Sequence, residues 1–591
     1  MGAPTSILLH LRRAAPRTVA LLSPRRLIRN AGTQASLIGG NMRAGENADT
    51  GSGRASRQMS GGLLWPSAPG VAGGYGGDFG RSDGDAEHVD APEGDRGLLS
   101  AVFDSVVKVH CTHSEPDYLM PWQRVRQSTS SSSGFVVDAE GIGRRILTNA
   151  HSVDYGSMSL VQRRGAEKKY PAAVEAIGNE CDLALLRVDD PEFWSGPDGG
   201  DGGGAVPALR FGPLPRLQDE VDVLGYPTGG DSLSVTSGVV SRTEMQEYVH
   251  AGMSLLAVQI DAAINSGNSG GPVVNGRREV VGVAFQSLGS AENIGYVVPV
   301  TVVRHFLEDV RRHGGYTGFC SLGVKLNLLQ NAAFRKSLGM RDGATGVAIR
   351  SVDPTFPAAT LQLLQPSDVI TAADDIPVAN DGKIPFRHGE RVSLACYIQT
   401  KFVGDSVRLD LLRDGRETSV DLPVSVRSPK LPAHWNDEPP PYLVVSGLVF
   451  TVLSVPLLKW RNAWGGYVSD DISYLLGLRN DYVEQEGDQV VVLAQVLAHR
   501  ENLGYDKYMD LHLVTYNGAE VRSLRHLHRL IRSGEEEFMR FEFAGDGPVI
   551  VLERSTMEEV TREVCGEHGI REASYLPTKE ETTDVSAEES S

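Results

Sequence analysis

A single serine lies within a glycine-rich segment, NSGNSGGPVVNG (265–276), directly before an apolar, strand-like stretch. A serine hydroxyl is a weak nucleophile near neutral pH and needs a histidine as base and an acid that orients that histidine. Free backbone N–H groups in a glycine-rich turn can stabilise the negative charge that develops on a substrate oxygen. Ser269 is therefore a candidate nucleophile, and the amides of Gly267 and Ser269 are candidate oxyanion donors.

The segment GNSGG also matches G-x-S-x-G, the nucleophile motif of α/β-hydrolases, which requires a strand, a turn and then a helix. Here Ser269 is followed by GGPVVNG, which cannot begin a helix, so we exclude that class. The alternative is a double-barrel hydrolase, whose partners follow in the order His, Asp, Ser. The candidate base is His151 in RILTNAHSV, where a strand-like segment runs into a loop. The candidate acid is Asp182 in NECDLALLRV, at the head of an apolar strand.

The elements that must position these residues are short β segments. From about residue 98, β-branched stretches follow one another between turn residues as far as IGYVVPV (294–300), which predicts an all-β sandwich or pair of barrels. Apolar residues then recur at helical spacing in VTVVRHFLEDVRRHG (300–314), which ends in a glycine stop signal. Two later stretches each read as strands, a helix and further strand, so we expect two small domains of one kind, with helices in RVSLACYIQTK (391–401) and LRHLHRLIRSG (524–534).

The motifs LTNAHSV, DLALLRV, VTSGVVS and IDAAINSGNSGGPVVN resemble those of the Deg/HtrA (protease Do) family of serine proteases, and the following segments resemble its PDZ domains. The resemblance spans roughly 100–560, and PFRHGERV (385–392) is similar to plant and algal organellar members. It implies a mainly β fold, with a chymotrypsin-like double β-barrel domain over 98–315 and two PDZ-like α+β domains over 316–430 and 442–560. It also implies roles for His151 as general base, Asp182 as orienting acid and Ser269 as nucleophile, with Gly267, Asn268 and Ser269 forming the oxyanion hole.

The same resemblance implies contacts with substrate. The segment CSLGVKL (320–326) resembles the carboxylate-binding loop of a PDZ domain, where backbone amides hold a peptide C-terminus while the peptide extends a sheet edge. The second PDZ-like domain has no comparable loop, and we expect it to serve assembly or regulation. Ser266 stands where the family often has proline, which leaves open how well the oxyanion hole is preorganised. The residues assigned to substrate binding are Ile264, Ser321, Leu322, Gly323 and Val324.

The composition is that of a globular chain with several domains. Its 591 residues exceed what one hydrophobic core holds, and 41% of them are hydrophobic. The net charge of −18 argues against general nucleic-acid binding. Five scattered cysteines without CxxC spacing argue against a disulfide framework or zinc knuckle and are typical of a reducing compartment. We expect Cys181 to be a buried filler, and His110 and Cys111 to face opposite sides of a strand, so that no metal or cofactor is expected.

The first 45 residues are rich in arginine and contain no acid before Glu46, which is typical of an organelle transit peptide. The arginine content favours import into the mitochondrion, with the chloroplast next. The alternatives are a nuclear protein, a basic tail that carries no targeting signal, and a myristoylation signal ending at Ser6. We expect a disordered Gly-rich linker over 46–97 and an acidic disordered tail over 570–591. The apolar segment 442–458 is shorter than the about 20 residues of a membrane span and contains Pro456, so we interpret it as buried strands.

These features predict an ATP-independent serine endopeptidase that degrades unfolded or damaged proteins through an acyl-enzyme, in protein quality control. No P-loop motif G-x-x-x-x-G-K-[ST] occurs in the sequence, so unfolding by nucleotide hydrolysis is not supported. The expected partners are unfolded chains, peptide C-termini and further copies of the chain, as a trimer or a multiple of three by the family resemblance. The alternative is a proteolytically inactive PDZ-type peptide-binding scaffold or holdase chaperone, against which the complete set of His, Asp and Ser argues.

Overall fold

The computed structural model describes residues 100–195, 205–248, 252–287, 294–387, 389–464 and 470–577. The expected transit peptide, the Gly-rich linker and the last part of the acidic tail lie outside these residues. Among the helices in the described ranges, none combines the length and the apolar character that a membrane span needs.

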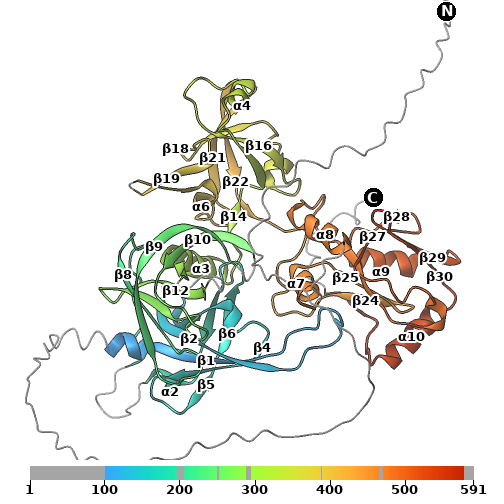
Figure 1. The fold of residues 1–591 in the computed structure, drawn as a ribbon, viewed down its shortest axis with the longest axis horizontal. Helices are drawn as coiled ribbons and strands as arrows, with labels where there is room; N and C mark the ends of the chain where they lie inside the picture. Colours follow the sequence, from blue (N-terminus) through green and yellow to red (C-terminus); the bar gives the residue numbers. More distant parts are fainter. Residues whose placement is uncertain are drawn as a thin grey trace, which may run out of the picture. The chain divides into compact units, whose positions relative to one another are not determined.

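The first strands form a seven-stranded antiparallel sheet in the order β5-β4-β1-β2-β3-β7-β6. Several of them are labelled in blue and teal in Figure 1. Its strands are rich in valine, leucine and isoleucine, and these side chains are buried on both faces of the sheet: in β1, Val107 and Val109 belong to one apolar cluster and Val106 to another. Two of its connections matter for the site: the turn between β3 and β4, and the turn between β6 and β7. The bounds are β1 (Val106–His113), β2 (Ser128–Ala139), β3 (Gly143–Thr148), β4 (Gly156–Arg163), β5 (Lys169–Pro171), β6 (Ala173–Gly178) and β7 (Leu183–Arg187), followed by α2 (Pro191–Trp194).

The next six strands close into a barrel in the order β10-β13-β12-β11-β8-β9. The helix α3 (Val300–His313) follows the barrel and ends at Gly314, whose φ of 73° provides the left-handed stop, as predicted. Two β-sheet subdomains thus precede the remaining domains, which confirms the predicted mainly β fold class. The strands are β8 (Glu220–Gly225), β9 (Ser234–Tyr248), β10 (Met253–Ile260), β11 (Pro272–Asn275), β12 (Val280–Ser287) and β13 (Gly295–Pro299).

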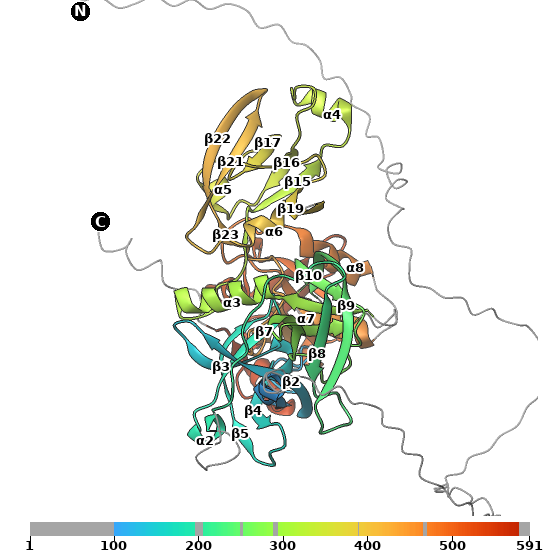
Figure 2. The same ribbon diagram turned by 90° about the vertical axis from the view of Figure 1, so that its left-hand side faces the viewer.

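The third region is a small α+β domain built on a sheet in the order β15-β16-β17-β21-β22 (Figure 2), with β18 paired to β17. The expected helix over 391–401 is shorter than predicted, because Arg391 to Ser393 pair with β19 in a hairpin and only the following residues are helical. The elements are β14 (Cys320–Ser321), β15 (Val324–Leu328), α4 (Ala332–Ser337), β16 (Val347–Val352), α5 (Pro357–Thr360), β17 (Val369–Ala373), β18 (Ile376–Pro377), β19 (Lys383–Arg387), β20 (Glu390–Ser393), α6 (Leu394–Ile398), β21 (Ser406–Arg413), β22 (Arg416–Pro423) and β23 (Ser425–Val426).

The last region is a second α+β domain on a sheet in the order β30-β29-β27-β26-β25-β24-β31, with β28 paired to β27. The apolar segment 442–458 forms two buried strands, as predicted, but Pro456 lies in the first turn of a helix, a position that proline tolerates. The elements continue past residue 560, where we expected the domain to end. They are β24 (Tyr442–Val445), β25 (Leu448–Val452), α7 (Val455–Trp464), α8 (Asp470–Gly477), η2 (Leu478–Asn480), β26 (Val491–Val496), η3 (Arg500–Asn502), β27 (Leu511–Tyr516), β28 (Ala519–Glu520), α9 (Leu524–Ser533), β29 (Phe538–Phe543), β30 (Val549–Glu553), α10 (Met557–Glu567) and β31 (Ser574–Tyr575).

Candidate active site

His151 lies in the short 3₁₀ turn η1 (Ala150–Ser152), which connects β3 to β4. The preceding Asn149 is buried, and its side-chain amide donates to the backbone carbonyl of Asp182 at 2.8 Å. This bond links the histidine turn to the turn between β6 and β7, which in the sequence comes after a further three strands. The two turns therefore hold each other at one edge of the first sheet.

Asp182 is buried and its backbone is left-handed, with φ of 53°, a conformation that aspartate tolerates better than most residues. Its carboxylate accepts from Nδ1 of His151 at 2.7 Å and from the backbone N–H of His151 at 3.0 Å. The Nδ1 contact assigns the ring proton to Nδ1 and leaves the Nε2 lone pair as the base. Desolvation lowers the pKa of His151, but the charge of Asp182 and the hydrogen bond to it raise the pKa above its ordinary value.

Ser269 lies in a turn where the chain passes very close to neighbouring backbone. At Gly270, φ is 83°, and a Cβ there would clash with the carbonyl of Ser133 and the hydroxyl of Thr148. At Gly271 a Cβ would clash with the carbonyl of Leu224. These glycines are therefore required by the approach of the turn to both β subdomains, and they hold the serine at the boundary between the two.

The turn orients two backbone amides by fixing the carbonyls of the same peptide units. The carbonyl of Ser266 accepts from Thr228 N–H at 2.7 Å, and the carbonyl of Asn268 accepts from Gly271 N–H at 3.0 Å. In a trans peptide the N–H points away from the C=O. The N–H groups of Gly267 and Ser269 therefore point the other way, and neither donates to an acceptor in the described part of the chain.

The other expected member of this set, Asn268, is placed differently. Its backbone N–H donates to the carbonyl of Asn265 at 3.0 Å, and its side chain is buried. Asn268 thus maintains the turn, and the two amides with no acceptor are those of its neighbours.

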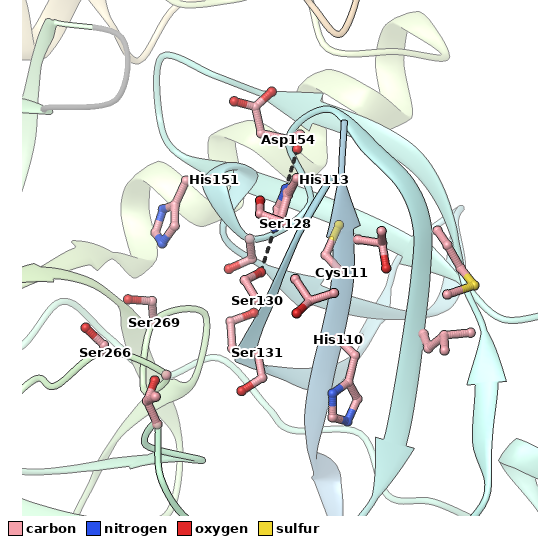
Figure 3. A pocket seen from close by; sticks show the side chains of 18 of the residues that line it. His110, Cys111, His113, Ser128, Ser130, Ser131, His151, Asp154, Ser266 and Ser269 are labelled. Carbon is pink, nitrogen blue, oxygen red and sulfur yellow. Dashed lines mark hydrogen bonds between the residues drawn. The ribbon is translucent and has the colours of Figure 1, made fainter. Parts of the chain in front are cut away.

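His151 and Ser269 line the same cleft, which has a volume of about 1060 Å³. Figure 3 shows the His151 ring and the Ser269 side chain facing this cleft from separate loops. The Ser269 hydroxyl donates to the carbonyl of Phe285 at 3.4 Å. A hydrogen bond from Ser269 to the imidazole would replace this one, because the hydroxyl has a single proton to donate, and catalytic hydrogen bonds often tighten only when substrate is bound. The arrangement can perform nucleophilic attack with the imidazole as base.

The structure keeps the other predicted substrate contacts away from this cleft. Ile264 is only 6% exposed and packs in the core of the second barrel. Ser321, Leu322 and Val324 line a second cavity of about 660 Å³. Besides β15 and α6, residues of the barrel (Glu247, Ser254) and of the second α+β domain (Val455, Arg479) line it. Gly323, between them, has φ of 66°, and its N–H donates to the Ser321 hydroxyl at 3.0 Å. Because β15 is the edge strand of its sheet, this cavity lies where an added peptide strand would run.

The structure also shows the surroundings of the cysteines and the histidine whose roles are predicted from the sequence. Cys181 is fully buried, its thiol donates to the carbonyl of Gly178 at 3.4 Å, and burial raises the pKa of the thiol well above its usual range. His110 Nε2 lies 3.0 Å from Gln162 Oε1, whereas Cys111 Sγ lies 3.7 Å from Ser159 Oγ. The two residues on β1 thus have separate partners.

Sequence reasoning missed Ser133, which is fully buried beneath the turn of Ser269. Its hydroxyl donates to the carbonyl of Gly267 at 2.7 Å and accepts from Tyr226 N–H at 2.8 Å, and its own N–H donates to the carbonyl of Ser269 at 2.9 Å. Sequence reasoning also missed Asn149. The sequence feature that could have pointed to Ser133 is the run of serines directly before the apolar segment GFVV, because a polar residue there lies within a buried strand.

Comparison with known families assigns a model to each of three regions. Residues 132–283 match a trypsin-like peptidase domain, and residues 320–424 and 431–574 each match a PDZ domain. The candidate residues His151, Asp182 and Ser269 all fall within the first of these matches.

Among curated proteins, the chain is 42% identical over 475 residues to "Protease Do-like 2, chloroplastic" of Arabidopsis thaliana, covering 80% of this chain and 74% of the relative. It is 37% identical over 486 residues to "Protease Do-like 4, mitochondrial" of the same plant, covering 82% and 88%. Among solved structures, "HtrA-type protease AlgW with decapeptide" matches with a TM-score of 0.43 at 24% identity, covering 56% of this chain and 99% of that one.

Proposed function

The chain belongs to the Deg/HtrA (protease Do-like) family of trypsin-like serine peptidases with PDZ domains, and on that premise we propose that it cleaves peptide bonds with a triad of His151, Asp182 and Ser269. The observation that carries the proposal is the 2.7 Å contact between Asp182 and Nδ1 of His151, beside a cleft that Ser269 also lines. A residue set for nucleophilic catalysis needs such a base with a defined tautomer.

In the proposed mechanism, Nε2 of His151 takes the proton of the Ser269 hydroxyl as Oγ attacks the carbonyl carbon of the scissile bond. The resulting oxyanion accepts hydrogen bonds from the N–H groups of Gly267 and Ser269. His151 then gives its proton to the leaving amine, which breaks the C–N bond and leaves an acyl-enzyme. Water, deprotonated by the same imidazole, releases the second product and restores the hydroxyl.

We further propose that the substrates are unfolded or damaged proteins and that the chain works in protein quality control without ATP. The cleft of about 1060 Å³ is lined by both His151 and Ser269, and an extended segment of an unfolded chain is the form of substrate that we propose for it. The first PDZ domain is proposed to hold a peptide C-terminus along β15, with amides of the Ser321–Val324 loop at its carboxylate.

The relatives include chloroplastic and mitochondrial proteases, and we propose that this chain is imported into an organelle, the mitochondrion in the first place. The arginine-rich, acid-poor residues 1–45 support import. The proposed assembly is a homo-oligomer, a trimer or a multiple of three. Imaging of residues 1–60 fused to a fluorescent protein tests the proposed import into an organelle, and a diffuse signal contradicts it.

The decisive experiment labels the purified full chain with a fluorophosphonate probe, which reacts only with an activated serine, and follows casein cleavage in parallel. The wild type is expected to be labelled and to cleave casein without ATP, whereas Ser269→Ala does neither. Ser266→Ala is the matched control, because it removes a neighbouring hydroxyl but keeps the backbone carbonyl that Thr228 holds. Equal labelling and cleavage by the wild type and Ser269→Ala would remove Ser269 as the nucleophile, and a wild type that does neither would leave a peptide-binding protein without peptidase activity.

A further inference from the structure

The segment between β23 and β24, which joins the two PDZ domains, carries three polar residues that contact the peptidase domain: His434, Asn436 and Asp437. We call these three residues the linker clasp. His434 is largely buried, with 9% of its side chain exposed, although it belongs to a connecting segment. Burial of a polar residue in a linker requires specific partners. The partners lie on the two turns that carry His151 and Asp182.

The first set of contacts reaches the turn that carries His151. Nε2 of His434 lies 3.0 Å from Oδ1 of Asp154, three residues after His151. The carboxylate of Asp437 accepts from the backbone N–H of Tyr155 at 2.7 Å. The rings of His434 and Tyr155 also stack, with centroids 5.5 Å apart.

Tyr155 has a left-handed backbone, with φ of 48°, which is costly for a residue with a large side chain. Its carbonyl accepts from Ser114 N–H at 2.9 Å, and its N–H is held by Asp437. The clasp therefore supplies one of the bonds that keep this strained residue, and the turn before it, in place.

The second set of contacts reaches the turn that carries Asp182. Asn179, buried at the end of β6, donates its side-chain amide to Oδ1 of Asn436 at 2.9 Å and lies 3.0 Å from Nδ1 of His434. The carbonyl of Asn179 accepts from Asp182 N–H at 3.4 Å. Nδ1 of His434 also accepts from Asn436 N–H at 2.7 Å, so two donors meet this nitrogen and assign the ring proton to Nε2, opposite Asp154.

We propose that the linker clasp positions the catalytic pair, because a single segment from outside the peptidase domain fastens the His151 turn through Asp154 and Tyr155 and the Asp182 turn through Asn179. This inference rests on the proposed triad. The clasp residues touch neither substrate nor reacting atoms, so they are positioning residues.

The test uses the full chain and three variants of the clasp. Asn436→Ala removes the acceptor of Asn179 at an exposed position, and Asp437→Ala removes the acceptor of Tyr155 N–H. Asp437→Asn keeps a carbonyl oxygen at the same place and is the rescue variant. Arg387→Ala is the matched control, because it removes the contact of Arg387 on β19 with the carbonyl of Pro215 at 2.7 Å, away from both catalytic turns and from both cavities.

The readouts are the rate and the amplitude of fluorophosphonate labelling and the separate values of kcat and KM for a peptide substrate. The amplitude counts folded sites, and the rate constant reports their geometry. Asn436→Ala and Asp437→Ala are expected to label at full amplitude but about tenfold more slowly, with kcat reduced and KM unchanged, as loss of one hydrogen bond would give. Asp437→Asn is expected to restore the rate, and Arg387→Ala to match the wild type.

Wild-type rates in both alanine variants would overturn the inference and leave the proposed function standing. A reduced amplitude at an unchanged rate would also overturn it, because the clasp would then only stabilise the fold. A wild type that is not labelled would overturn the proposed function and the inference together.

Discussion

The hydroxyl of Ser133 on β2 donates to the carbonyl of Gly267 at 2.7 Å, across 134 residues of sequence. This bond joins the first β sheet to the turn that precedes Ser269, which belongs to the second barrel. The two halves of the peptidase domain are thereby coupled at the candidate oxyanion hole, because movement of one sheet against the other displaces the Gly267 peptide.

Replacement of Ser133 by alanine is expected to reduce kcat at least about tenfold, with a smaller change in KM. The variant leaves the buried carbonyl of Gly267 and the N–H of Tyr226 without this partner, and an unsatisfied buried polar group costs about 1–3 kcal/mol. Steady-state cleavage of a peptide substrate measures both constants. Ser105→Ala is the control, since the equally buried Ser105 hydroxyl lies 2.7 Å from the carbonyl of Pro207, away from the cleft. Equal kcat losses in the two variants would contradict a role for Ser133 at the site.

Gly270→Ala is expected to abolish labelling of Ser269 and to lower the free energy of unfolding by more than about 1 kcal/mol. At φ of 83° a side chain strains the backbone, and the new Cβ would clash with Ser133 and Thr148. Urea unfolding and probe labelling measure the two effects. Gly276→Ala in the same region is the matched control, since a Cβ there meets no atom within 4 Å. Normal labelling of Gly270→Ala would show that the turn can move without loss of activity.

The activity should depend on pH through His151, whose pKa is raised above the ordinary 6.5 by Asp182 in spite of desolvation. The imidazole acts as base only when neutral, so kcat/KM is expected to rise with pH through a midpoint above 6.5 and to fall on acidification.

In Asp182→Asn the carboxylate that stabilises the protonated ring is lost, so the midpoint moves to lower pH, and the plateau rate drops by about 10⁴-fold. A pH profile of kcat/KM for both forms measures these shifts. Asp189→Asn, which alters an exposed carboxylate paired with Arg187 at 2.8 Å, should leave the profile unchanged. An unchanged midpoint in Asp182→Asn would remove Asp182 from the proposed role.

The cavity lined by β15 and α6 should bind peptides that end in an apolar residue with a free carboxylate. Leu326→Glu is expected to weaken such binding at least about tenfold, because a charge would replace an apolar side chain that lines the cavity. Fluorescence anisotropy with a labelled peptide measures the affinity, and the C-terminal amide of the same peptide should bind weakly. Leu328→Glu on the same strand is the control, since Leu328 is exposed and does not line the cavity. Equal affinities for acid and amide would contradict carboxylate recognition.

Much of the fold followed from local patterns. The helix over 300–313 ended at Gly314, as the glycine stop signal predicted, because this kind of helix end depends on the residues next to it. The helix expected over 391–401 was shortened, because pairing of Arg391–Ser393 with β19 took precedence over helical spacing. Ile264 had the expected apolar character, but its place in the barrel core depends on strand closure, which no local pattern encodes.

The sequence alone was enough to propose the residues of the candidate site, because His151, Asp182 and Ser269 each lie in a local motif that is typical of the role proposed for them. Only the tertiary structure revealed what holds them: Ser133 beneath the Gly267 carbonyl, Asn149 on the Asp182 carbonyl, and the linker clasp on both catalytic turns. Each of these contacts joins polar groups from distant parts of the chain. A hydrogen bond depends on the position of both partners, and those positions arise only when the sheets close and the domains pack.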